Sequence, residues 1–300
     1  MVHGTSARQR LATGVRVAIV GIALLAASGA GNHASAADDA VLADLGNDGK
    51  LTNCIDPAFP PMEFYEGSDT STPVGFDIDL TKAIAEKLGV EAKFVPLEFT
   101  GLLPGLQGDR CDIVASGIYL TAERVQVFGA QPYYDSSMIL VTLAGNDEVN
   151  APEDLSGKTV AVQSGTNYQK MIEALDAKLK ADGKDGITIQ TYPKQTDADQ
   201  QVVLERADAT ITQDTEMAFR EQKQPGIFRI AYTYPEKQTF AIYYGKDKTA
   251  LGTALNDTVE GMRSDGTLAN IATTWNLPSE GVEFTREVGT EATPEASPAS

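Results

Sequence analysis

Apolar residues between positions 51 and 275 follow two alternating periods. Short apolar runs typical of buried strands alternate with longer stretches in which apolar side chains recur every three or four residues, as they do on one face of a helix. In the first part of the chain this pattern predicts strands at 51–55, 91–96 and 112–116 and helices at 77–88 and 101–107. Such alternation favours parallel sheets covered by helices.

The helix expected at 77–88 has the clearest signals. Leu80, Ile84 and Leu88 form an apolar stripe at helical spacing. Asp77 and Asp79 are placed to interact favourably with the positive end of the helix dipole. We expect an ordinary core helix.

A second, similar alternation begins after residue 158. It predicts strands at 159–163, 187–192 and 209–212 and helices at 169–179, 198–206 and 215–222. A strand at 239–244 and helices at 249–264 and 267–275 follow, and they have no clear partners in this second group. The sequence therefore predicts two α/β lobes, with the chain returning to the first lobe after the second.

The two ends of the chain are expected to lie outside the fold. Arg8, Arg10 and Arg16 lead into an apolar run at 17–31 and a small-x-small site at 34–36, which is the pattern of a cleaved signal peptide over residues 1–36. The run spans about 15 residues, against the roughly 20 that a membrane-spanning helix needs. No cysteine lies near this site, so we expect a soluble protein in the periplasm or extracytoplasmic space, without a lipid anchor. Residues 37–50 read as a polar lead-in and 285–300 as a disordered tail.

Charge and histidine content exclude several classes of function. Without the predicted signal, 21 basic and 42 acidic side chains remain, a formal net charge of −21. Nucleic acid and anionic membranes are therefore poor partners, because like charges repel. Both histidines, His3 and His33, fall in the predicted signal. Their absence from the mature chain removes Ser-His-Asp and Cys-His catalysis and the commonest zinc sites, and we expect no metal and no cofactor.

The two cysteines, Cys54 and Cys111, lie in or just before predicted strands. Adjacent parallel strands would bring them together, and an exported protein can hold a disulfide. Two buried free thiols are the alternative.

Residues 75–80, Gly-Phe-Asp-Ile-Asp-Leu, continuing to Leu88, resemble the signature of the bacterial polar amino-acid-binding proteins of ABC importers, solute-binding protein family 3. Further matching segments follow in the family's order at 56–61, 99–106, 116–124, 131–134, 154–158, 160–162 and 164–166, so the resemblance covers nearly all of 51–284. It implies a type II periplasmic-binding-protein fold of two α/β lobes joined by crossovers near 134–138 and 236–240. Lobe 1 would comprise 51–135 and 240–284, and lobe 2 would comprise 139–236.

The resemblance also implies where an amino-acid ligand would lie. Arg124 matches the family's carboxylate ligand, in the first turn of a helix that Thr121 caps. Thr166 and Gln169 fit a capping box, so that a second helix would also point its amino end at the carboxylate. Ser116 and Gly117 belong to the matching segment 116–124, and Asn167 directly follows the matching segment 164–166.

The position expected to receive the α-ammonium departs from the family. The family has an aspartate after the strand that resembles 207–212, whereas this chain has Gln213 there and Asp214 one residue later. Either Gln213 has replaced the acid or the strand carries an extra residue and Asp214 faces the ligand.

The aromatic and distal positions point to the ligand's side chain. Phe59 and Phe99 match the family's ligand-flanking aromatics, and Tyr119 stands where many members have a smaller hydroxyl residue. The three rings would suit a cationic ligand, although Phe59 and Phe99 could simply be core residues. Asp56 matches a position that meets the side chain's polar end, with Gln163 at the corresponding strand end of the second lobe.

The leading hypothesis is a monomeric, non-enzymatic binding protein that delivers a polar or basic amino acid to an ABC transporter permease. A betaine- or ectoine-like zwitterion is an alternative ligand. An enzyme similar to the exported cyclohexadienyl dehydratases, which share this scaffold, would need Asp56 or Asp214 as an acid. A ligand-sensing lobe for a membrane receptor is the third possibility.

Overall fold

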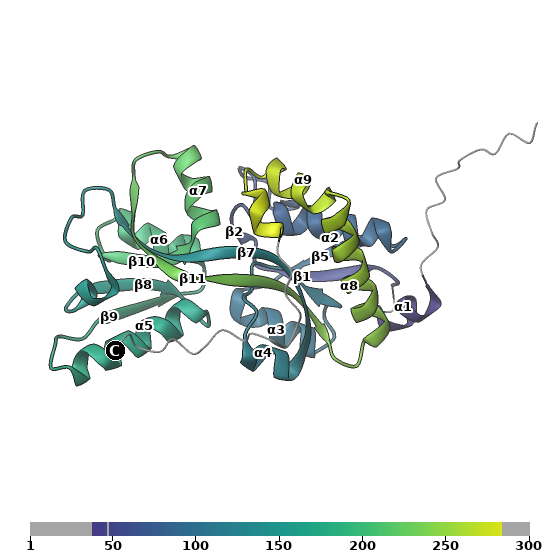
Figure 1. Ribbon diagram of the computed structural model, residues 1–300, viewed down its shortest axis with the longest axis horizontal. Helices are drawn as coiled ribbons and strands as arrows, with labels where there is room; N and C mark the ends of the chain where they lie inside the picture. The colour runs from purple at the N-terminus through teal and green to yellow at the C-terminus, as the bar shows by residue number, and fades with distance from the viewer. Residues whose placement is uncertain (1–37, 47, 284–300) are drawn as a thin grey trace, which may run out of the picture. The chain divides into compact units, whose positions relative to one another are not determined.

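The computed structural model describes residues 38–46 and 48–283, where it has a mixed α/β fold with one eight-stranded and one three-stranded sheet (Figure 1). The predicted signal peptide and C-terminal tail lie outside the described residues. Across the large sheet the strands are β5 (Ala92–Pro96), β1 (Leu51–Ile55), β6 (Ile113–Val114), β11 (Phe228–Gly245), β7 (Phe128–Leu143), β10 (Ala209–Gln213), β8 (Thr159–Gln163) and β9 (Thr188–Tyr192).

Two long strands, β7 and β11, run through the middle of this sheet and pair with each other in antiparallel fashion. Their register places Tyr134 opposite Phe240 and Ser137 opposite Lys237, so the two predicted crossovers lie side by side. The expectation of parallel sheets does not hold at this centre, where β6–β11, β11–β7 and β7–β10 are antiparallel. The outer pairs β1–β5, β1–β6, β10–β8 and β8–β9 are parallel, as predicted.

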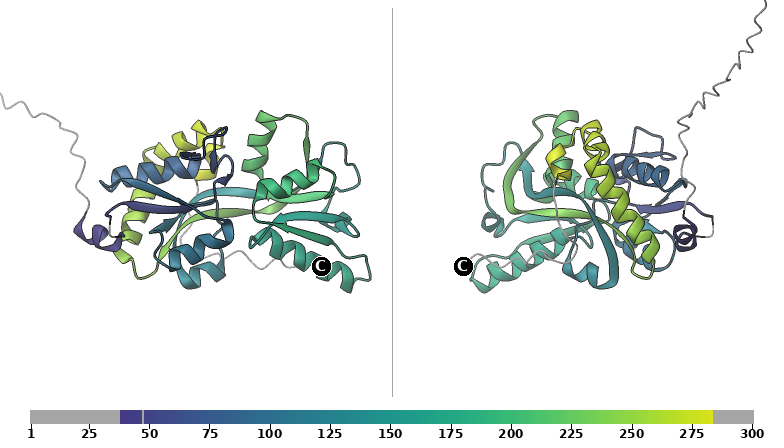
Figure 2. Two further views of the ribbon diagram at one scale, coloured as in Figure 1. Left: turned by 180° about the vertical axis from the view of Figure 1, so that it is seen from behind. Right: turned by 45° about the vertical axis from the view of Figure 1, so that its right-hand side comes forward.

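In the first lobe, helices cover both faces of β1, β5 and β6 (Figures 1 and 2). The helices α2 (Phe76–Lys87), α8 (Thr249–Ser264) and α9 (Thr267–Thr274) lie on one face, and α3 (Phe99–Gln107) and α4 (Ala122–Val127) lie on the other. Strand periodicity divides the core accordingly: Ile113 packs in the cluster of α2 and α8, and Val114 packs with Leu102 of α3. The positions of α8 and α9 show that the chain returns to the first lobe after β11.

The second lobe has the same layered arrangement around β8, β9 and β10. Helix α5 (Asn167–Ala181) lies on one face, and α6 (Gln195–Val203) and α7 (Asp214–Lys223) lie on the other (Figures 1 and 2). Val160 and Val162 pack with Ile172 of α5, and the intervening Ala161 packs with Ala198 of α6. Alternate residues of one strand therefore anchor helices on opposite faces.

Part of the predicted lead-in belongs to the fold. Residues 39–44 form α1 (Asp39–Asp44), which Asp38 caps by accepting a hydrogen bond from the Ala40 N–H group. Val41 and Leu45 are buried in the core cluster that includes α8. The exclusion of 37–50 was wrong here because two apolar residues four apart suffice to dock one helical turn, although the segment is polar overall.

A small antiparallel sheet, not expected from the sequence, lies beside the first lobe. It consists of β2 (Ala58–Phe59), β3 (Glu63–Tyr65) and β4 (Pro73–Val74). Such short strands leave almost no periodic signal, yet they position Phe59 and Glu63. The remaining helical elements are the short 3-10 turns η1 (Pro152–Leu155) and η2 (Ser279–Val282).

The expected disulfide is confirmed. Cys54 in β1 and Cys111 just before β6 are joined, with their Cα atoms 5.6 Å apart. The parallel pairing of β1 with β6 brings them together, and both are buried.

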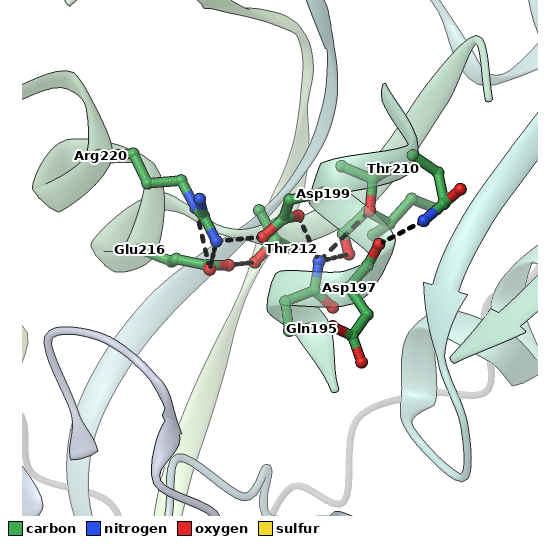
Figure 3. Close-up of polar contacts among 9 residues, drawn as sticks. Gln195, Asp197, Asp199, Thr210, Thr212, Glu216 and Arg220 are labelled. Atoms are coloured by element: carbon green, nitrogen blue, oxygen red, sulfur yellow. Dashed lines mark hydrogen bonds and ion pairs between the residues drawn. The ribbon is translucent and has the colours of Figure 1, made fainter. Parts of the chain in front are cut away.

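A buried polar cluster fixes α6 and α7 to β10 (Figure 3). Arg220 of α7 forms ion pairs with Asp199 of α6 and Glu216 of α7. Glu216 also accepts a hydrogen bond from the Thr212 hydroxyl, and the Gln195 amide donates to Asp199 Oδ1 over 2.8 Å. Asp199 and Glu216 are 1% and 0% exposed, so the Arg220 guanidinium is what compensates their charge.

Candidate functional site

A pocket with about 370 Å³ of atom-free space, counting its solvent-open part, lies where strands of both lobes end. It is lined by Asp56, Phe59, Glu63, Phe99, Ser116, Gly117, Tyr119, Arg124, Gln163, Thr166, Asn167, Tyr168 and Gln213.

Strand ends position most of the polar lining. Asp56 directly follows β1, Ser116 and Gly117 follow β6, and Gln163 and Gln213 are the last residues of β8 and β10. Because parallel strands present their carboxyl ends at one edge of a sheet, residues far apart in sequence meet there. Of the predicted ligand residues, all except Asp214 line the pocket.

Asp214 lies outside the pocket lining. It is the first residue of α7, and its Oδ1 accepts a hydrogen bond of 2.7 Å from the Ser136 hydroxyl. Strand β10 pairs with β7 in continuous register up to Gln213, which lines the pocket and is only 2% exposed. A neutral amide therefore stands where the resemblance predicts an acid.

Arg124 brings an uncompensated positive charge to the pocket. Its Nη1 donates to the Tyr119 carbonyl over 2.8 Å, and the Tyr243 hydroxyl donates to the same oxygen. Thr121 caps α4 as predicted, accepting from the Arg124 N–H group. Among the described residues, the ion pairs of arginine involve Arg220 and Arg263 and leave Arg124 without a carboxylate partner. This guanidinium is available to an anionic group.

Asp56 adds a negative charge to the pocket, at a contact between the first lobe and Gln163 of the second. It is 3% exposed, and its Oδ2 accepts a hydrogen bond of 2.7 Å from Gln163 Nε2. Burial raises the pKa of Asp56 to about 6, although the bond from Gln163 opposes that rise. Asp56 is therefore mostly ionised at neutral pH, and a fall of about one pH unit begins to protonate it.

The amino end of α5 also faces the pocket. Thr166 caps the helix by accepting from the Gln169 N–H group over 3.3 Å, and Asn167 is its first residue. The predicted capping box is only half correct, because Gln169 Oε1 accepts from the Gly165 N–H group, not from that of Thr166. Gly165 directly precedes the cap residue Thr166, and its N–H group is the donor that the Gln169 side chain reaches.

Four aromatic rings flank the polar groups. Phe59, Phe99 and Tyr119 line the pocket as predicted, and Tyr168 joins them. Tyr119 stacks on Phe240 with ring centroids 5.3 Å apart and meets Tyr168 edge to face at 6.1 Å. One face of Tyr119 is thus already covered, and burial raises its pKa.

Two lining residues, Glu63 and Tyr168, were not predicted. Glu63 lies in β3 and accepts a hydrogen bond of 2.5 Å from the Ser116 hydroxyl. A lone glutamate in a short polar segment gives no sequence signal of burial. Tyr168 follows Asn167 in the first turn of α5. Its position next to a predicted ligand residue was the only sequence signal that could have indicated it.

The two lobes contact each other beside the pocket in this structure. Besides the Gln163–Asp56 bond, Gln213 Nε2 lies 3.5 Å from the Gly117 carbonyl oxygen. Gly117 has a φ of +53°, and an added Cβ would lie 2.7 Å from a Phe59 ring carbon. Glycine is required there because both the conformation and the close approach exclude a side chain.

Comparison with known proteins places this site in a family. Residues 51–278 match the bacterial extracellular solute-binding proteins, family 3. The chain belongs to this family. A probable amino-acid-binding protein of Bacillus subtilis, YxeM, is 28% identical over 84% of this chain and 89% of its own length.

Solved structures of family-3 relatives share the fold. The P235GK mutant of ArgBP from T. maritima superposes with a TM-score of 0.70 and 31% identity over 78% of this chain and 98% of that one. An ancestral amino-acid-binding protein described as a precursor of cyclohexadienyl dehydratase gives 0.67 and 28% over 76% and 96%. This solute-binding protein therefore has the two-lobed α/β fold with two crossovers that its sequence predicts.

The family and its relatives bear on location and chemistry. The family is one of extracellular proteins, and the relatives are amino-acid-binding proteins. Within residues 38–46 and 48–283, no helix is both long and apolar enough to cross a membrane. The same residues contain no group of histidine, cysteine, aspartate and glutamate side chains suited to a metal ion.

Proposed function

We propose that this protein captures a polar or basic amino acid between its lobes and delivers it to an ABC importer. The observation that carries the proposal is the pocket's pair of opposite charges: Arg124 has no carboxylate partner, and Asp56 is buried with only an amide partner. A free amino acid with a basic or polar side chain supplies both complements. The arginine-binding and amino-acid-binding relatives support the same class of ligand.

In this proposal each end of the pocket has a distinct role. Arg124 and the amino end of α5, at Thr166 and Asn167, receive the ligand's carboxylate. Asp56 and Gln163 receive the polar end of the side chain, and Phe59 and Phe99 flank its apolar part. Because Gln213 is neutral, the α-ammonium is held by amide and carbonyl oxygens and not by a second carboxylate.

Closure of the lobes would couple binding to transport. We assign lobe 1 to residues 51–135 and 240–284 and lobe 2 to 139–236, with hinge motion in the paired central segments of β7 and β11. A ligand that contacts both lobes favours the closed form, which a transporter permease can recognise. We further propose that the protein works as an exported monomer after removal of residues 1–36.

A binding screen tests this function. The purified, ligand-stripped protein is heated with each of the twenty amino acids, polyamines, betaines and ectoine, and hits are measured by calorimetry. A ligand at 100 times its dissociation constant adds about 2.7 kcal/mol to the free energy of unfolding. We expect a hit among polar or basic amino acids. Hits confined to betaine-like compounds, or turnover of prephenate or arogenate without any amino-acid hit, would contradict the proposal.

A further inference from the structure

Two carboxyl groups lie together in the first lobe behind the pocket wall. Glu63 of β3 and Asp77 in the first turn of α2 are both 0% exposed. Among the described residues, no lysine or arginine forms an ion pair with either group. Two adjacent buried carboxylates without a cation cannot both be ionised at an acceptable cost.

The hydrogen bonds account for one oxygen of each group. Glu63 Oε1 accepts from the Ser116 hydroxyl over 2.5 Å. Asp77 Oδ2 accepts from the Gly117 N–H group over 2.8 Å and from the Tyr133 hydroxyl over 2.9 Å. Glu63 Oε2 and Asp77 Oδ1 receive no donor from elsewhere, and the two carboxyl groups contact each other. One proton between these oxygens satisfies both.

The surroundings determine which acid keeps the proton. Burial and the charge of Asp77 raise the pKa of Glu63 well above its usual value. Burial raises the pKa of Asp77 to about 6, while the donors Tyr133 and Gly117 oppose that rise by stabilising its ionised form. The other ionisable groups that act on the pair are Asp56, from the end of β1, and Tyr133, from β7. The proton therefore resides mainly on Glu63, which donates to Asp77.

We propose that Glu63 and Asp77 share one proton and that this shared proton positions the Ser116–Gly117 segment of the pocket. The Ser116 hydroxyl directs its hydrogen to Glu63, which leaves Ser116 Oγ to accept the Asp56 N–H group over 3.0 Å. Asp77 holds the Gly117 amide on the other side. The shared proton thus links Glu63 of β3 and Asp77 of α2, and these two acids hold Ser116 and Gly117. Only its effect on ligand affinity rests on the proposed function.

A double-mutant cycle on ligand-free protein tests the shared proton. Glu63→Gln places an amide N–H where the proton sits and keeps an acceptor for Ser116, and Asp77→Asn does the converse. Each single variant is expected to keep the folding equilibrium constant within about threefold, whereas the double variant makes two amide donors face each other and loses about tenfold more than the singles combined. A double loss equal to the product of the single losses would overturn the proposal.

The pH dependence of stability gives an independent readout. In the unfolded chain these acids release their protons near their usual pKa values of 3.8 and 4.5, whereas the folded pair keeps one proton to higher pH. Raising the pH from about 5 therefore lowers the folding equilibrium constant, by up to about tenfold per pH unit, until the pair loses that proton. Glu63→Gln should remove this part of the slope. The exposed Glu66→Gln, three residues away, is the control and should retain it; equal slopes in all three proteins would contradict the proposal.

Positioning is measured at the Gly117 amide by NMR. Its chemical shift should follow the titration of the pair in wild type, stay near the wild-type value without that titration in Glu63→Gln, and move in Glu63→Ala. A Gly117 amide shift that is the same under all three conditions would exclude positioning.

L-arginine and L-glutamine serve as affinity probes: their binding should weaken more steeply above pH 7 in wild type than in Glu63→Gln. If neither probe binds wild type, the proposed function fails in that form, and the ligand-free readouts still decide the proton.

Discussion

The two lobes meet the pocket with different kinds of groups. The first lobe contributes ionisable side chains, namely Asp56, Glu63 and Arg124. The second lobe contributes neutral polar ones, namely Gln163, Thr166, Asn167 and Gln213, together with the Tyr168 phenol. We infer that the first lobe provides most of the charge recognition and the second lobe completes the pocket on closure.

The buried charges behind the pocket differ in the same way. In the second lobe Asp199 and Glu216 share Arg220, and their contacts lie outside the pocket lining (Figure 3). In the first lobe Glu63 and Asp77 have no such cation and contact pocket residues directly. Burial and the charge of Glu216 raise the pKa of Asp199 as well, but Arg220 opposes that rise, whereas no cation opposes the rise at Glu63 or Asp77.

The largest effect on stability is expected from Arg220→Met. The substitution leaves Asp199 and Glu216 buried without their cation, and it should lower the free energy of unfolding by about 3 kcal/mol. Urea unfolding measures this, with the exposed Arg206→Met of the same lobe as control. Adding Asp199→Asn should recover part of the loss, since one uncompensated charge is removed. Ligand affinity measured on the folded variant should change little; a loss as large as that of Arg124→Ala would break the distinction between the lobes.

Arg124→Ala tests the other side of the comparison. It removes a cation that has no carboxylate partner in the protein, so the free energy of unfolding should change by less than about 1 kcal/mol. If the ligand's carboxylate is its partner, affinity should fall by about a hundredfold or more. Calorimetry with the amino acid found in the screen measures the loss, and the exposed Arg110→Ala of the same lobe is the control. Unchanged affinity in Arg124→Ala would refute its assigned role.

The sequence predicted elements with strong periodicity and most of the pocket, for identifiable reasons. Strand β1 and helix α8 were predicted at their observed bounds. Pocket residues such as Gly117 and Arg124 lie in segments that match the family's motifs and follow in the family's order. Because ligand sites of such folds lie at the carboxyl ends of the strands, the predicted strands suffice to place those segments together.

The features that escaped prediction depend on tertiary contacts. The central strands β7 and β11 contain polar residues at 135–137 and 236–239, which hide a continuous strand from any periodicity. Asp77 has the sequence position of a helix-dipole acid, yet it turns inward to Gly117. Burial of Glu63 is equally invisible, since its partners come from α2 and from the segment after β6.

The titration of Asp56 should distinguish a basic ligand from a neutral one. The raised pKa of about 6 means that Asp56 gains a proton as the pH falls below that value, and its attraction for a cationic side chain is lost. Affinity for L-arginine should then fall by up to about tenfold per pH unit between about pH 6 and pH 4.5. L-glutamine should show a smaller change, and Asp56→Asn should be nearly flat for both. An equal fall for both ligands in wild type would place the titrating group elsewhere.

The smallest effect concerns the contact between the lobes at Gly165. This residue precedes the cap of α5 and has a φ of +75°, and an added Cβ would lie 2.9 Å from Thr100 Cγ2 of α3 in the first lobe. Gly165→Ala should therefore weaken ligand binding by about fivefold, because the clash opposes closure. Gly183 is a matched control, since it has the same φ of +75° but nothing within 4 Å of an added Cβ. Gly183→Ala carries the same backbone strain and should leave affinity unchanged. Thr100→Ser removes the methyl group that the new Cβ meets, so it should restore binding to Gly165→Ala. If affinity is lost equally at Gly165 and Gly183, or if Thr100→Ser restores nothing, the effect comes from strain within the second lobe and not from the approach of the two lobes.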